Sequence, residues 1–288
     1  MAQEASIQQS QANLRQTNSW WRVLLIALVL YLLGIAVLIL TGNPNLFPTV
    51  VMLGSFMVPA TYVAFFYERR HLSQLTLPTT LKSFFYGGVL GVFAAALLEP
   101  LFIRQLDFAT VFVVGLIEEF AKILGVLVIA RRRQHDSEMD GLILGAAAGM
   151  GFAALESTGY AFSAFLQSGG NLSLTVALTL LRGLLSPLGH GTWTAILASV
   201  LFRESQAGHF RIDRKVVGAY LIVSILHGLW DAIPAVMTTL VLPGLDILIG
   251  QSIVGGAGLY ILWRRWREAK RLQMSRIAIS AAGEYGEW

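Results

Sequence analysis

The chain of 288 residues contains no cysteine. This absence excludes disulfide bonds, thiolate metal ligands and cysteine nucleophiles. Charged side chains are also scarce, at 13% of residues, whereas apolar ones make up 55% and the mean hydropathy is +0.64. A soluble domain of this length could not bury that much apolar surface. The composition therefore predicts an all-α polytopic membrane protein.

Long apolar runs recur along the whole chain. A helix needs about 20 apolar residues to cross the hydrocarbon core of a bilayer, and eight runs come close to or exceed that length. The first is too long for a signal-peptide core and lacks a small-residue cleavage site, so we expect it to be retained. The eight predicted helices are 20–40, 48–67, 84–102, 108–130, 141–165, 174–202, 216–237 and 245–263.

Basic residues mark one side of the membrane. When the loops are assigned alternately to two sides, all but three of the 21 lysines and arginines fall on one side. The exceptions are Arg104, Lys122 and Arg182. Cytoplasmic loops are enriched in Lys and Arg, so both termini are predicted to be cytoplasmic. This placement, and not nucleic-acid binding, accounts for the net charge of +4.

The same pattern predicts three regions. Residues 1–19 are polar and rich in glutamine, which is typical of a flexible cytoplasmic tail. Residues 20–263 form the transmembrane domain, with a catalytic core at about 108–237. Residues 264–288 form a basic cytoplasmic tail. The bilayer is a partner throughout, and the protein is expected in a prokaryotic cytoplasmic membrane.

Three charged residues interrupt the run at 108–130. Glu118, Glu119 and Lys122 lie near its centre. On insertion scales each such charge costs roughly 2.5–3.5 kcal/mol, so a functional role is the first hypothesis. Lys122 is three and four residues from the two glutamates, so it can reach either carboxylate.

Other polar residues in the spans are expected at a similar depth. Glu156, His190 and His227 each lie near the middle of a different predicted helix, and Asp231 is one turn after His227. Pro187 could break its helix and aim His190 inward. Glu99 lies near an outer end and fits an interfacial position better. The carboxylates outnumber Lys122 and Arg182, and the surplus requires protons or a cation.

Two forms of hydrolytic chemistry fit this layer. Zinc takes nitrogen and carboxylate ligands and acidifies water, and Glu156, His190 and His227 would suffice as metal ligands, with Glu118 or Glu119 as the base. Without a metal, one of these two glutamates could still activate water while a histidine stabilises the oxyanion. Lys122, Arg182 and Asp231 would tune the charges. The simpler interpretation is a set of salt bridges that holds the bundle together.

Four motifs occur in a familiar order. EEFAK at 118–122 resembles the EExxK signature of the PrsW intramembrane proteases, relatives of the CAAX prenyl endopeptidases and the bacterial CPBP proteins. Residues 140–160, 182–195 and 227–232 resemble the glycine-rich FxxxE helix, the Arg-to-His segment and the last His motif of that family. Ser157 and Asp231 depart from it, because asparagine is usual at both positions.

The resemblance implies an intramembrane endopeptidase that cleaves a membrane-anchored protein or peptide. Relatives cleave membrane-tethered regulators or prenylated peptides. One alternative is a transporter or proton-coupled channel that uses the buried acids as a relay, although no inverted repeat is evident. The other is a non-catalytic scaffold, which would have little reason to keep so costly a polar layer.

Overall fold

The computed structural model describes residues 19–70, 73, 75–105, 107–131, 137–205, 209–237 and 245–284. Within these ranges the chain forms helices and no strand, which confirms the all-α prediction. The elements in chain order are α2 (Trp20–Thr41), η1 (Pro44–Leu46), α3 (Phe47–Glu68), α4 (Leu77–Phe102), α5 (Thr110–Ala130), α6 (Glu138–Gln167), α7 (Leu172–Leu185), η2 (Ser186–Leu188), α8 (His190–Glu204), α9 (Arg214–Met237) and α10 (Leu245–Glu284).

Seven helical segments of the described chain are long and apolar enough to cross a membrane. One of them, Leu172–Glu204, combines α7, η2 and α8. Helix α5 is absent from the seven, and its interior carries Glu118, Glu119 and Lys122. Its 21 residues nevertheless span about 32 Å at 1.5 Å per residue, which matches the hydrocarbon thickness. Counting α5 gives the predicted eight helices, and the number of spans remains a prediction.

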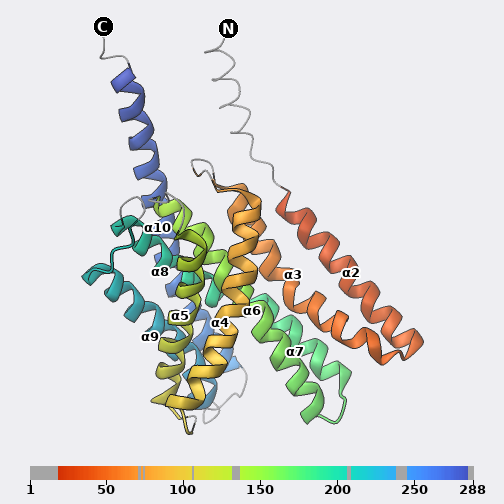
Figure 1. The fold of residues 1–288 in the computed structure, drawn as a ribbon. Coiled ribbons are helices and arrows are strands. Elements are labelled where there is room, and N and C mark those ends of the chain that lie inside the picture. The colour runs from red at the N-terminus through yellow and green to blue at the C-terminus, as the bar shows by residue number, and fades with distance from the viewer. Residues whose placement is uncertain are drawn as a thin grey trace, which may run out of the picture.

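The surface of the bundle is suited to lipid. Large apolar side chains are exposed on α2, where Leu33 is 56% and Leu40 84% accessible. Figure 1 shows α2 at the edge of the molecule, beside α3. Water would penalise this exposure at roughly 25 cal/mol per Å² of apolar surface, whereas lipid tails would not. The protein is therefore an integral membrane protein.

Helix α6 forms the centre of the bundle (Figure 1). Most of its residues are buried, and it packs against α3, α4, α7 and α8. Glycines allow the closest of these contacts. A Cβ on Gly145 would overlap the carbonyl oxygen of Thr194, and one on Gly149 would overlap that of His190. The backbone of α8 therefore lies directly against α6, as small residues allow in membrane helices.

Helices α5 and α9 each begin after an aspartate. Asp107 Oδ1 accepts hydrogen bonds from the amides of Ala109 and Thr110, both at 2.9 Å. Asp213 Oδ1 accepts them from Lys215 at 2.9 Å and Val216 at 3.1 Å. These bonds lower the pKa of both carboxyl groups, because they stabilise the charged form. Each aspartate thus satisfies amide groups that the first helical turn leaves unpaired.

Candidate active site

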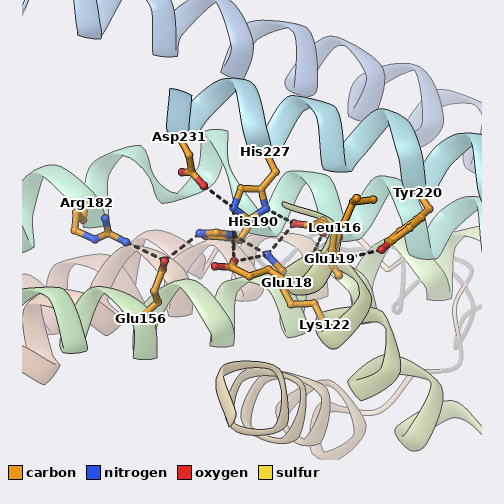
Figure 2. Close-up of polar contacts among 11 residues, drawn as sticks. Leu116, Glu118, Glu119, Lys122, Glu156, Arg182, His190, Tyr220, His227 and Asp231 are labelled. Atoms are coloured by element: carbon orange, nitrogen blue, oxygen red, sulfur yellow. Dashed lines mark hydrogen bonds and ion pairs between the residues drawn. The ribbon is translucent and has the colours of Figure 1, made fainter. Parts of the chain in front are cut away.

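The polar layer predicted from the sequence comes together at one place (Figure 2). Helix α5 supplies two glutamates and a lysine, α6 a glutamate, α7 an arginine, α8 its first residue, and α9 a histidine and an aspartate. Helix α8 begins at His190 because the 3₁₀ turn η2, with Pro187 at its centre, interrupts the predicted span at 174–202. The break at Pro187 is therefore confirmed, and it places His190 among the other polar residues.

Lys122 lies at the inner end of the site and is fully buried. Its Nζ is 2.7 Å from Glu119 Oε1 and 3.3 Å from Glu118 Oε2. It also lies 2.8 Å from His190 Nδ1. One ammonium thus contacts both adjacent carboxylates and an imidazole, and it offsets part of their charge where water cannot.

Each histidine contacts a different carboxylate through one of its ring nitrogens. His227 Nδ1 is 3.1 Å from Glu119 Oε1, and its Nε2 is 3.6 Å from Glu118 Oε2. His190 Nε2 is 3.1 Å from Glu156 Oε2, and its Nδ1 is 3.8 Å from Glu118 Oε2. With N–H donated to Glu119 and to Glu156, the second nitrogen of His190 accepts from Lys122 Nζ, 2.8 Å away. The second nitrogen of His227 lies between Asp231 and Glu118.

Glu156 is engaged by an arginine as well as by His190. Arg182 Nη2 donates to Glu156 Oε2 at 2.8 Å, and its Nε donates to Ser157 Oγ at 3.3 Å. The guanidinium also lies 4.0 Å from the centre of the Tyr160 ring, a cation–π contact. Arg182 therefore fixes Glu156 at the edge of the site and neutralises its charge.

A cavity of about 520 Å³ opens onto these residues. Glu118, Glu156, His190 and Asp231 line it, whereas Glu119 is fully buried and does not. The two neighbouring glutamates thus have different surroundings. Glu99 also lies in the wall of the cavity, and its interfacial depth stays a prediction. The volume falls within the roughly 300–1,000 Å³ of typical ligand sites.

Comparison with known proteins identifies the family. The model of the PrsW family of intramembrane metalloproteases matches residues 76–273. The chain belongs to this family. Protease PrsW of Halalkalibacterium halodurans is 28% identical over 189 residues, which cover 63% of this chain and 82% of that protein. No solved structure matches the chain.

Membership of the PrsW family makes the chain an intramembrane protease. The family part of the sequence-based resemblance is thereby confirmed. The relation to CAAX prenyl endopeptidases and CPBP proteins stays a prediction.

The family description implies a metal ion, and the residues present fit one. Among the described residues, one ligand atom each from Glu118, His190 and His227 lies within 4.8 Å of the others. Two imidazoles and a carboxylate are a common donor set for catalytic zinc. Glu156 was predicted as the carboxylate ligand, and Glu118 is a second candidate, since it lies near both imidazoles. The role of Glu156 as a ligand is untested.

Two further residues support the site and were missed from the sequence. Trp193 is fully buried, and its ring lies 5.5 Å from that of His190 and 4.8 Å from that of His227. Thr194 Oγ1 donates to Glu119 Oε2 at 3.1 Å. The signal for Trp193 is a repeated pattern, because HGTW begins at His190 and HGLW at His227.

Proposed function

We propose that the protein hydrolyses a peptide bond of a membrane-anchored protein substrate inside this cavity. Glu118, His190 and His227 are the proposed ligands of a divalent metal, which we take to be zinc. The observation that carries the proposal is their convergence at one cavity. A metal in this donor set would polarise the scissile carbonyl and acidify a water molecule.

The surrounding residues are assigned the remaining steps. Glu119 accepts a hydrogen bond from His227 Nδ1–H, and Glu156 accepts one from His190 Nε2–H. Each ring therefore keeps one tautomer and one orientation. Asp231 Oδ2, in place of the Glu118 or Glu119 expected from the sequence, takes the proton of the attacking water and returns it to the amine nitrogen as the peptide C–N bond breaks. It faces the cavity and lies 3.4 Å from His227 Nε2, whereas Glu156 is already bound by Arg182. Lys122 and Arg182 balance the carboxylates.

The residues that line the cavity favour a substrate anchored in the membrane. Apolar residues of α4 and α5, such as Val92, Ala96 and Val114, line it beside the carboxylates. The cavity therefore offers both apolar and polar side chains to an extended substrate backbone. Neither the transporter nor the scaffold alternative has an observation in its favour beyond the buried charges themselves.

A cleavage assay tests the proposal. Purified protein in detergent is incubated with a library of membrane-tethered peptides, and the fragments are identified by mass spectrometry. Glu118→Gln is expected to lower the cleavage rate by roughly 100-fold or more. Glu99→Gln removes the same charge from another part of the cavity wall and should retain most activity. Full cleavage by the Glu118→Gln protein would contradict the proposal.

A further inference from the structure

A second cavity of about 250 Å³ adjoins the first. Arg182, His190, Trp230 and Gln251 line both, so the two share part of their walls. A group held in the second cavity therefore borders the proposed reaction site at His190.

The second cavity is apolar where the first is acidic. Its walls include Leu178 and Leu185 of α7 and Ile247 of α10. Glu118 and Asp231 line the first cavity and not the second. Among the described residues of its wall, the charged and imidazole groups are Arg182 and His190, both at the shared boundary. Most of the remaining wall is aliphatic apart from Ser157, Ser186 and Gln251, so the interior favours an aliphatic or aromatic group.

Its size and position suit one side chain. A volume of about 250 Å³ lies below the roughly 300–1,000 Å³ of pockets for drug-sized ligands. Its wall also includes Ser186 of η2 and Gly189, the residue just before His190. A side chain held there has its own backbone beside the imidazole, so the pocket can set which bond is presented.

We infer that the cavity between α7, α9 and α10 is a specificity pocket, which binds a large apolar side chain of the substrate residue next to the scissile bond. This inference rests on the proposed function and deepens it. In an apolar pocket a single methylene changes kcat/KM by roughly 10–200-fold. The enzyme should therefore prefer leucine to alanine at this position by at least tenfold in kcat/KM.

Narrowing the pocket is the first test. Leu178→Trp adds bulk from a half-buried position in its wall. The variant should cleave the alanine peptide within about threefold of the wild-type rate and lose most of the preference for leucine. Leu184→Trp is the matched control, because Leu184 lies on the same helix, is 70% exposed and lines neither cavity.

Widening the pocket is the second test, and it does not depend on whether the Leu178→Trp protein folds. Leu185→Ala removes bulk from the same wall and should shift the preference from leucine toward phenylalanine. Leu184→Ala is its control and should leave the preference unchanged. Both tests use paired peptides that vary each of the two residues flanking the cleaved bond, with kcat and KM measured separately.

The possible results distinguish failure of the specificity pocket from failure of the proposed protease function. If wild-type protein cleaves the leucine and alanine peptides equally, or if both pocket variants keep the wild-type ratio, the specificity pocket is wrong and the protease function stands. If wild-type protein cleaves no peptide of the set, the proposed function fails and the specificity pocket fails with it.

Discussion

The two adjacent glutamates of α5 differ because neighbouring residues on a helix point in different directions. Glu118 lines the cavity and lies within 4 Å of both imidazoles. Glu119 has no exposed surface and contacts Lys122, Thr194 and His227. The first is therefore placed to act on a ligand, and the second to hold a residue that does.

Replacing Glu119 by Gln tests this division. The amide keeps the shape of the side chain but removes the charge that orients His227 Nδ1–H and pairs with Lys122. We expect metal affinity and cleavage rate each to fall by about 10–100-fold, with the fold retained. Metal affinity is measured by competition with a chromophoric chelator.

Thr194→Val is the control for this substitution. It removes a different hydrogen bond to Glu119 and leaves the carboxylate in place, so its effect should be smaller. A Glu119→Gln protein with wild-type metal affinity would show that Glu119 does not orient His227.

The spacing of residues in the sequence predicts only some of the contacts in the site. Residues four apart on a helix share a face, and the contacts Glu118–Lys122 and His227–Asp231 follow from that rule. The contact of Arg182 with Glu156 joins two helices whose rotation about their axes no single sequence reveals. For the same reason the sequence did not predict that Glu118 lies within 4 Å of both imidazoles.

Among the helices, α6 and α8 decide where His190 lies. Glycines on α6 let the backbone of α8 approach until no Cβ fits between them. The repeat of Gly141, Gly145 and Gly149 every four residues predicts such a face from the sequence alone. Close packing of α6 and α8 thus positions the first residue of α8 within the site.

Substituting Gly149 tests that packing. In Gly149→Ala the new methyl group overlaps the carbonyl oxygen of His190, so α8 must move. Cleavage should fall by at least about tenfold, because overpacking costs roughly 1–3 kcal/mol and displaces a site residue. The rate is measured on the best library peptide, and the unfolding temperature is measured in detergent.

Gly159→Ala on the same helix is the matched control, since a Cβ there meets nothing within 4 Å. It should keep wild-type activity and gain slight stability from the better helix propensity of alanine. Equal activity of the two variants would remove the packing argument.

Helix boundaries are less predictable than helix existence. The structure begins α4 at Leu77, although the apolar run begins at residue 84. Helix α10 continues to Glu284, well beyond the predicted end at 263. Hydropathy reports the part of a helix that lies in lipid, whereas the helix itself can extend into water at either end.

For the whole molecule, the charge pattern predicts both termini in the cytoplasm. Figure 1 agrees in one respect, because the start of α2 and the last turns of α10 lie at the same end. The absence of cysteine makes the prediction simple to check. Asn45→Cys and Ser275→Cys each add one exposed thiol, and the predicted topology places the two on opposite sides of the membrane.

In intact cells a membrane-impermeant maleimide should label Asn45→Cys and should label Ser275→Cys only after permeabilisation. The reverse pattern would invert the orientation, and labelling of both in intact cells would contradict the alternating spans. Fractionating the cell and finding which membrane contains the protein tests its predicted location in the cytoplasmic membrane.

The central claim is that Glu118, His190 and His227 hold one catalytic metal, and metal analysis of the purified protein tests it most directly. Wild-type protein and Glu99→Gln should each carry about one divalent ion per chain, and Glu118→Gln should carry much less. Removing the ion with a chelator should abolish cleavage, and zinc should restore it. Full cleavage by metal-free protein would contradict the account and leave Glu118 as the base of a metal-free protease.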